Sequence, residues 1–323
     1  MLKIVYAGSP EISAILLQGL IDSKQTHIAA VLTNAPAPAG RSKTARQTPV
    51  AALAREQGLC VLEPEKLDAH IRARIEALKP DLLVCFAYGK IFGPKFLSLF
   101  PKGGINVHPS LLPKYRGCAP VPAAILAGET KTGVTIQRLA REMDCGDILA
   151  QKEIALNGTE TAAELLSDAA ALSIPLVSDV IAQIEKGCEK PIAQNPKDAC
   201  YCKTLVKTDA RMDWTKSALQ LCAQVRALQP WPGTYTCTSD GTKLYIHKAC
   251  VYEASGASDV CSCTAVPGTV IGIDKNCGIL VQTGKGILAV QVLQKETKKA
   301  MNWKDFLNGC RNFTGTLCTH PAQ

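Results

Sequence analysis

Three polar residues in the middle of the chain have the types and spacing that acyl-transfer chemistry needs. Asn106 and His108 are two residues apart in GGINVHPS, so on a strand their side chains point to the same face. An amide and an imidazole on one face can stabilise a carbonyl oxygen that develops negative charge. Asp144, in EMDCGDIL, can orient the imidazole or accept a proton through water. Asp144 and Asp147 could equally each hold a tight turn, so spacing alone leaves the roles open.

The apolar pattern around these residues predicts an α/β arrangement with parallel strands. Strands are expected at 2–7, 27–33, 60–63, 81–89, 103–110, 132–139 and 147–156, and helices at 12–20, 49–57, 67–78 and 119–127. A long helix begins near Thr161, and Pro175 should kink or break it. His108 then lies at the C-terminal end of a strand, before a polar loop that ends at Pro120. Ligands bind at such strand ends in open α/β sheets. The first loop has Gly8 but no GxGxxG, which disfavours a dinucleotide.

The second part of the chain has a different pattern. Apolar periodicity fades over residues 190–208, which we interpret as an interdomain linker. Beyond it one helical segment is followed by many short strands, with turns at Asp240-Gly241 and Gly284-Lys285-Gly286. Short strands without intervening helices predict a small β-barrel or sandwich. The expected domains are therefore 1–189, a linker at 190–208, and 209–323.

Charge is distributed unevenly between these parts. The chain has a formal net charge of +8; residues 1–190 carry 21 basic and 19 acidic side chains, and residues 191–323 carry 15 and 9. The polar loop 34–48 adds Arg41, Lys43 and Arg46 without an acidic residue. This asymmetry favours a polyanionic partner such as nucleic acid. A surface charge that serves solubility and a loop without a partner remain the alternatives.

The fifteen cysteines do not form a recognisable framework. Their number is odd, no CxxC pair occurs, and Cys200/Cys202 and Cys261/Cys263 have no His at zinc-finger spacing. Most lie in apolar stretches and are expected to act as small core residues. The N-terminus leads directly into a strand, and no apolar run reaches the roughly 18 residues of a membrane helix. We therefore expect a reduced, cytoplasmic protein without a metal or a membrane segment.

Longer motifs resemble a known family. GGINVHPSLLPKYRGCAPVPAAILAGETKTGVTI, followed by MDCGDIL, is similar to the signature of the folate-dependent formyltransferases. That family uses Asn-x-His in a strand and Asp in a later loop as its catalytic triad, which maps onto Asn106, His108 and Asp144. Five further segments resemble the branch of this family whose acceptor is initiator methionyl-tRNA. They are VYAGSPE at the start of the chain, PAGRSK, KTLVKTDARMDW, QPWPGTY and PGTV.

The resemblance implies a fold, a co-substrate and a partner. The expected fold is a Rossmann-like formyltransferase domain with a mostly parallel sheet, followed by an oligonucleotide-binding (OB)-like β-barrel. The expected co-substrate is 10-formyltetrahydrofolate, and the expected partner is initiator methionyl-tRNA. The residues implied in folate binding are Ser110, Leu111, Leu112 and Pro113, with Phe86, Ala87 and Tyr88 in the pterin pocket. The cations expected to bind tRNA are Arg41, Lys43, Lys203 and Lys207, although Lys203 and Lys207 could simply lie in a solvated linker.

Other functions remain to be distinguished. A formyltransferase for a small amine, such as glycinamide ribonucleotide or an amino-sugar nucleotide, would share the triad but would not need a basic second domain. A non-catalytic RNA-binding protein would not need all three triad residues. A hydrolase of formylfolate would release formate without tRNA. We expect a monomer, because no association segment is evident.

Overall fold

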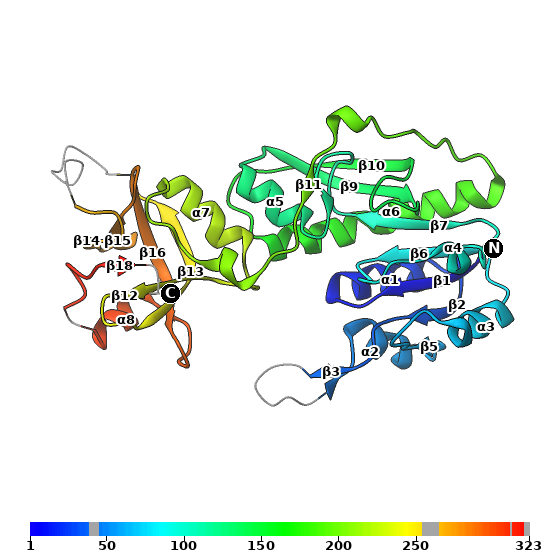
Figure 1. Cartoon of the computed structure of the whole chain (residues 1–323), viewed down its shortest axis with the longest axis horizontal. Coiled ribbons are helices and arrows are strands. Elements are labelled where there is room, and N and C mark those ends of the chain that lie inside the picture. The colour runs from blue at the N-terminus through cyan, green and yellow to red at the C-terminus, as the bar shows by residue number, and fades with distance from the viewer. Residues whose placement is uncertain (39–44, 254–264, 311, 320–323) are drawn as a thin grey trace. The chain divides into compact units, whose positions relative to one another are not determined.

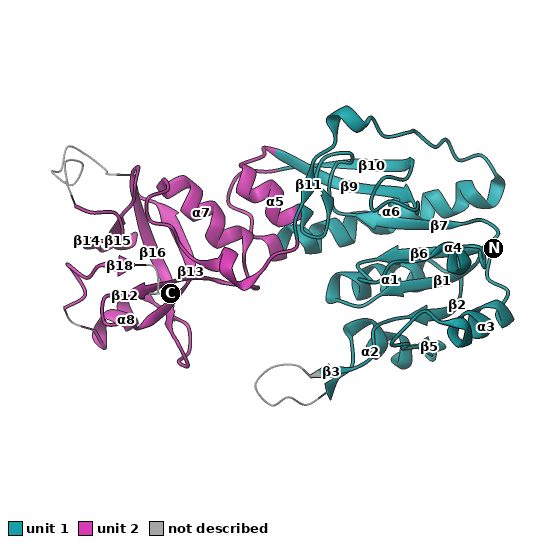
Figure 2. Cartoon of the chain, in the orientation of Figure 1, with its two compact units in different colours: residues 1–120, 131–155, 164–203 teal, residues 121–130, 156–163, 204–323 magenta. Residues whose placement is uncertain are grey.

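The computed structural model describes residues 1–38, 45–253, 265–310 and 312–319. Contacts between residues divide the chain into two compact units (Figure 2). Unit 1 comprises residues 1–120, 131–155 and 164–203, and unit 2 comprises residues 121–130, 156–163 and 204–323. Each unit has its own apolar core.

Unit 1 is built on a seven-stranded sheet (Figure 1). Its strands, in spatial order, are β10 (Ile148–Ala155), β9 (Lys131–Arg138), β7 (Gly104–His108), β6 (Leu82–Phe86), β1 (Lys3–Gly8), β2 (His27–Leu32) and β5 (Val61–Leu62). The five strands from β7 to β5 are parallel, whereas β9 is antiparallel to β7 and β10 is antiparallel to β9. The predicted Rossmann-like, mostly parallel sheet is confirmed.

Helices cover both faces of this sheet, as the nearly continuous burial of its central strands requires. Alternate residues of β1 show the division: Ile4 and Tyr6 pack with α1, α2 and α6, while Val5 and Ala7 pack with α3 and α4. The helices are α1 (Glu11–Ser23), α2 (Pro49–Glu56), α3 (Ala69–Ala77), α4 (Pro94–Leu97) and α6 (Ala162–Lys186). The positions of α1, α2, α3 and α6 agree with the apolar periodicity of the sequence, whereas α4 was not predicted.

The sequence predicts a kink or a break at Pro175; helix α6 runs without interruption from Ala162 to Lys186, so the break does not occur. The proline removes one main-chain donor, but Ala170 before it and Val177 and Val180 after it are buried in the core of unit 1. This packing holds the helix on both sides of Pro175. Within the described ranges, α6 is also the one helix long and apolar enough to cross a membrane by length and composition. A core helix meets the same test, and the burial of Val177 and Val180 fits that reading.

The polar loop at 34–48 contains a short hairpin base. β3 (Ala37–Pro38) pairs antiparallel with β4 (Ala45–Arg46). Residues 39–44, including Arg41 and Lys43, lie outside the described residues.

Unit 2 contains an antiparallel sheet. Its main path is β14 (Val270–Asp274), β15 (Gly278–Gln282), β16 (Ile287–Lys295), β13 (Lys243–Val251), β12 (Thr234–Thr238) and β18 (Cys318–Thr319), and β17 (Met301–Asn302) pairs with β16. The helical elements are α5 (Pro120–Ala127), η2 (Lys207–Ala210), α7 (Ala218–Ala227) and α8 (Trp303–Asn308).

The two ends of this sheet meet. Thr269 and Leu317 form an antiparallel bridge, and the Val270 amide donates to the Thr316 carbonyl at 2.9 Å. Thr269 lies just before β14 and Val270 begins it, while Thr316 and Leu317 lie just before β18. The sheet therefore curls until its two ends are joined. The expected barrel-like C-terminal sheet is confirmed.

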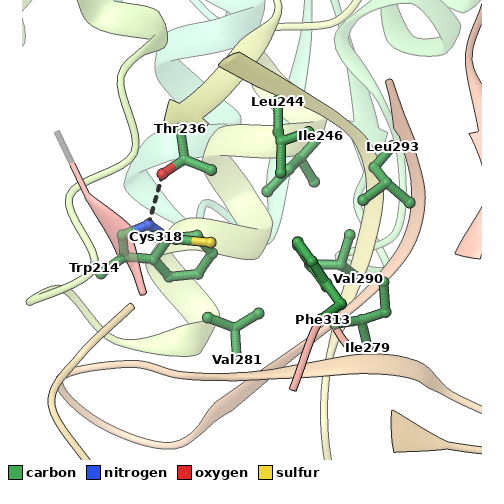
Figure 3. Close-up of a pocket in the computed structure, with 10 residues that line it drawn as sticks. All are labelled: Trp214, Thr236, Leu244, Ile246, Ile279, Val281, Val290, Leu293, Phe313 and Cys318. Atoms are coloured by element: carbon green, nitrogen blue, oxygen red, sulfur yellow. Dashed lines mark hydrogen bonds between the residues drawn. The ribbon is translucent and has the colours of Figure 1, made fainter. Parts of the chain in front are cut away.

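The interior of this curled sheet is apolar (Figure 3). It contains a cavity of about 10 Å³, close to the space of one water molecule. The Trp214 indole N–H donates to the Thr236 hydroxyl at 3.0 Å, so the buried polar atoms of this pair are satisfied. The lining residues are Trp214, Thr236, Leu244, Ile246, Ile279, Val281, Val290, Leu293, Phe313 and Cys318. This apolar interior stabilises unit 2, and the cavity is too small for an organic ligand.

Candidate active site

Asn106 and His108 lie at the C-terminal end of β7, between parallel β6 and antiparallel β9. Asn106 pairs with Cys85 on one side and with Gln137 on the other. Asn106 is half-buried and His108 is 4% exposed. In the part of the chain that the structure describes, the Asn106 side-chain amide has no hydrogen-bond partner. An amide held at the end of a buried strand, with its donors unused, is suited to bind a substrate oxygen.

Both nitrogens of the His108 imidazole have protein neighbours. Nε2 lies 2.8 Å from the Tyr115 carbonyl oxygen, and Nδ1 lies 3.6 Å from Oδ1 of Asp144. A carbonyl only accepts hydrogen bonds, so Nε2 carries a proton and donates to Tyr115. Nδ1 therefore faces the carboxylate, slightly beyond hydrogen-bond distance. The ring is held on two sides, by the Tyr115 carbonyl and by the Asp144 carboxylate.

The Asp144 carboxylate is fixed through both of its oxygens. Oδ1 accepts a hydrogen bond from Nε2 of Gln137 at 2.9 Å, and Oδ2 accepts one from the Gly117 amide at 2.8 Å. These partners lie on β9 and on β8 (Arg116–Gly117), not in Asp144's own turn. The alternative that Asp144 only caps a turn therefore does not account for its side chain. Asp147, in contrast, is exposed, and its main-chain carbonyl accepts from Arg138.

Sequence reasoning missed Gly117 and Gln137 as partners of Asp144. Gly117 has a φ of 106°, and a Cβ atom there would lie 2.4 Å from the Cys202 carbonyl oxygen. Gln137 faces Asn106 only because β9 is antiparallel to β7. The sequence predicts a strand at 132–139 and so places Gln137 on a strand, but no sequence signal predicts which strand pairs with it. Both residues depend on chain segments that meet only in the folded unit.

The segment Ser110–Pro113 follows β7 and is tied to β9. The Thr135 hydroxyl donates to the Ser110 carbonyl at 2.6 Å and accepts from the Leu112 amide at 3.1 Å. Ser110 and Leu112 are buried, whereas Leu111 and Pro113 are half-buried. Of the four residues implied in folate binding, Leu111 and Pro113 therefore have side-chain surface available.

Phe86 is the last residue of β6, the strand next to β7, and Ala87 and Tyr88 follow it. Phe86 and Tyr88 are each 1% exposed, and the Tyr88 ring stacks on Phe92 with centroids 5.5 Å apart. Burial raises the pKa of the Tyr88 hydroxyl. Ala87 is exposed, in the left-handed region with a φ of 50°. The side chains of Phe86 and Tyr88 are thus directed into the core, and a ligand at this strand end would meet Ala87 and the main chain.

The expected tRNA-binding cations fall into two groups. Arg41 and Lys43 lie outside the described residues. Lys203 and Lys207 are exposed, and neither makes an ion pair within the ranges that the structure covers. Their charges are therefore available to a partner.

The described cysteines are free thiols with differing environments. Cys85 is buried as expected, and burial raises its pKa to about 12. Cys60, Cys118, Cys188 and Cys200 are exposed, and among the described cysteines only Cys85, Cys237 and Cys318 are buried, so the expectation that most cysteines act as core residues is wrong. Cys261 and Cys263 lie outside the described residues. A search of the described part of the chain finds no group of three or more His, Cys, Asp or Glu residues that could hold a metal ion.

Comparisons with known proteins agree with this geometry. Residues 2–181 match the model of the formyl transferase family, and residues 204–311 match the model of the formyl transferase C-terminal domain. A relative named methionyl-tRNA formyltransferase, from Treponema denticola, is 47% identical over 320 residues, covering 97% of this chain and 98% of the relative. A relative of the same name from Borrelia hermsii is 35% identical, covering 98% and 99%.

Two solved structures share the fold. The N-formyltransferase from Helicobacter canadensis, in complex with folinic acid and dTDP-3-aminofucose, matches with a TM-score of 0.65 and 19% identity, over 91% of this chain and 100% of that one. HypX from Aquifex aeolicus, in complex with tetrahydrofolic acid, matches with a TM-score of 0.64 and 16% identity over 97% of this chain. The match covers 48% of HypX, so the chain spans about half of that protein. The family models cover most of the chain, and the relatives match nearly its whole length. The arrangement of Asn106, His108 and Asp144 agrees with both. The chain therefore belongs to the formyl transferase family.

Proposed function

We propose that this protein transfers the formyl group of 10-formyltetrahydrofolate to the α-amino group of methionine on initiator methionyl-tRNA. The observation that carries the proposal is the likeness, over 97% of the chain, to a methionyl-tRNA formyltransferase at 47% identity. The product serves translation initiation. The free amide of Asn106, beside an imidazole backed by a fixed carboxylate, is the chemistry that such a transfer requires.

Asn106 supplies the electrostatic part of the reaction. The acceptor amine attacks the formyl carbon while neutral, and the formyl oxygen gains negative charge. The Asn106 amide donates a hydrogen bond to that oxygen, and the imidazole of His108, on the same face of β7, lies beside it. Removal of one such donor typically costs about 10²–10³ in rate.

His108 and Asp144 handle protons and orientation. The amine loses a proton as the new C–N bond forms, and N10 of the folate gains one as the old C–N bond breaks. Asp144, held by Gln137 and Gly117, keeps Nδ1 of His108 beside a negative charge. The carboxylate thereby orients the imidazole and helps to move the amine proton through water.

The segments beside the triad would hold the folate. Ser110–Pro113 and Phe86–Tyr88 follow adjacent parallel strands, where ligands bind in sheets of this kind. The exposed Ala87 and the half-buried Leu111 and Pro113 provide surface for the folate's ring system. The co-substrate supplies an activated formyl group; these residues bind and orient it.

The large acceptor accounts for the basic residues. Phosphate contacts give affinity and position without reading sequence. We assign tRNA binding to Lys203 and Lys207, to Arg41 and Lys43 in the loop that includes residues 39–44, and to the C-terminal domain at 209–323. Transfer itself is assigned to residues 1–189, with 190–208 as the linker. We expect a cytoplasmic monomer that acts away from membranes, since its acceptor is a tRNA; sedimentation of the purified protein tests the monomer.

The decisive experiment follows labelled formyl from 10-formyltetrahydrofolate into three acceptors. These are charged initiator methionyl-tRNA, charged elongator methionyl-tRNA and glycinamide ribonucleotide. We expect strong labelling of the initiator tRNA alone. Labelling of the small amine only would keep the triad but overturn the tRNA acceptor. Binding of tRNA without transfer would indicate an RNA-binding protein, and release of formate without tRNA would indicate a hydrolase.

A further inference from the structure

A side-chain amide from the segment 190–203 forms hydrogen bonds to the turn that carries Asp144. Nε2 of Gln194 donates to the Asp144 carbonyl at 2.9 Å and to the Gly146 carbonyl at 2.7 Å. Oε1 of Gln194 accepts from Nε and NH2 of Arg116 at 3.0 Å and 2.7 Å. One amide thus joins the main chain on both sides of Cys145 to an arginine on β8.

The orientation of this amide is determined by its partners. A guanidinium only donates hydrogen bonds and a carbonyl only accepts them, so the oxygen of Gln194 faces Arg116 and its nitrogen faces the turn. Arg116 is 6% exposed, and its NH1 donates to the Tyr201 hydroxyl at 3.0 Å. Over the residues that the structure describes, this guanidinium makes no ion pair with an acidic side chain. Its buried position therefore depends on Gln194 and Tyr201.

The turn needs such support. Asp144 has a φ of 56°, in the left-handed region that costs a non-glycine residue about 1–2 kcal/mol. Gly146 passes the Arg138 carbonyl so closely that a Cβ atom would lie 1.8 Å from its oxygen. The Arg138 amide donates to the Asp147 carbonyl at 2.9 Å on that side of the turn. Gln194 holds the turn on the other side, at the residue that faces His108.

We propose that Gln194 is a positioning residue for formyl transfer: its amide nitrogen holds the main chain of Asp144 so that the carboxylate stays beside Nδ1 of His108. The inference rests on the proposed function. Gln194 touches neither substrate nor reacting atoms in this account, and it acts through Asp144. Part of the segment expected to link the domains thereby belongs to the catalytic machinery.

Two substitutions separate positioning from packing. Gln194→Ala removes both halves of the amide. Gln194→Glu keeps an oxygen for Arg116, and adds a charge that pairs with the guanidinium, but removes both N–H donors to the turn. We expect each variant to lower the single-turnover rate at saturating substrates by about 10–100-fold, because small misplacements of catalytic groups cost this much. KM for the folate and for tRNA should stay within about twofold, and Gln194→Glu should melt close to the wild type.

Asn195→Ala is the matched control. Asn195 is the next residue, and its side chain bonds to Asp198 and to the Lys197 amide rather than to the Asp144 turn. It should transfer formyl at the wild-type rate. A wild-type rate in Gln194→Glu would overturn the proposal, because neutralisation of Arg116 would then be the whole role. A defect confined to KM would also overturn it.

A second measurement does not depend on the activity. Trypsin cleaves after Arg141, which is exposed in the same turn region. Under native conditions, both Gln194 variants should be cut there faster than the wild type and than Asn195→Ala. Equal cleavage rates after Arg141 in the wild type and in all three variants would contradict the proposal that Gln194 holds the turn. If the wild type transferred no formyl at all, the proposed function would fail, and this cleavage would still report whether Gln194 holds the Asp144 turn.

Discussion

His108 and Asp144 meet through a single pair of atoms, Nδ1 and Oδ1, which lie 3.6 Å apart. Neither atom reaches that position through its own segment alone. The imidazole is held from the far side by the Tyr115 carbonyl, and the carboxylate is held by Gln137 and Gly117. The pair is therefore a product of the sheet and of two loops, and its separation is sensitive to residues in each of them.

Asp144→Asn is the sharpest change at this pair. Asparagine tolerates the left-handed backbone better than alanine does, and its oxygen can still accept from the Gly117 amide. The fold should therefore be retained while the negative charge beside His108 is lost. We expect the single-turnover rate of formyl transfer to fall by at least about 100-fold. A rate within threefold of the wild type, in a variant with an unchanged melting temperature, would remove the Asp144 charge from the mechanism.

Asn106→Ala tests the oxygen-binding role. Because the Asn106 amide makes no hydrogen bond to the protein within the described residues, its removal leaves no protein partner unpaired. The melting temperature and the affinity for tRNA should change little, while kcat falls by about 10²–10³. Rapid-quench formylation and tRNA filter binding measure the two effects. A large loss of stability without a specific loss of kcat would argue for a structural amide instead.

Gly117→Ala should damage both the fold and the site. A Cβ atom at this position would lie 2.4 Å from the Cys202 carbonyl, and the same residue's amide holds Asp144. We expect a loss of roughly 3 kcal/mol or more in the free energy of unfolding. Gly128→Ala is the control, because Gly128 also has a positive φ, of 69°, but nothing within 4 Å of the added carbon. Its loss should be only about 1–2 kcal/mol, measured by denaturant unfolding.

Thiol reactivity should follow burial. Burial raises the pKa of Cys85 and of Cys318 to about 12, so at pH 8 their thiolate fractions are minute. Iodoacetamide should therefore modify exposed Cys60 and Cys118 and spare Cys85 and Cys318 in the native protein. In denaturant all four should react. Peptide mass spectrometry gives the order, and early modification of Cys85 would mean that the sheet core opens locally.

Charge reversal tests the tRNA contacts. Lys203→Glu and Lys207→Glu should each raise KM for methionyl-tRNA severalfold at low salt, with an effect that shrinks as salt is raised. Lys102→Glu is the control, since Lys102 is exposed just before β7, at the end of the strand opposite His108. If all three variants behaved alike, Lys203 and Lys207 would be ordinary solvated linker residues.

Much of the fold could be predicted from local pattern. Continuous apolar runs gave the strands of unit 1, and helical spacing gave α1, α2 and α3 close to their bounds. These signals are local, because a strand buried on both faces is apolar at every position. Of the kink or break predicted at Pro175, the break does not occur, because that expectation weighed one lost hydrogen bond and not the packing of Ala170 and Val177 on either side of the proline.

The site was predictable only in part. Asn106, His108 and Asp144 stood out by type, spacing and resemblance, and the structure brings His108 and Asp144 together. Gln137, Gly117 and Gln194 did not stand out, because each acts through a partner that is distant in sequence. The roles of all these residues stay predictions until the experiments above are done, and the domain boundaries at 189 and 209 stay predictions as well.

The joining of β14 to the segment just before β18 has a consequence for how the protein behaves in a crowded solution. An open antiparallel sheet presents unpaired main-chain groups that can recruit a strand from another molecule. Here Val270 and Thr316 bond to each other, so part of each edge is occupied by the other. A chain shortened to end before Gly315 would uncover that part of the β14 edge, and it should associate with itself at concentrations where the whole chain does not.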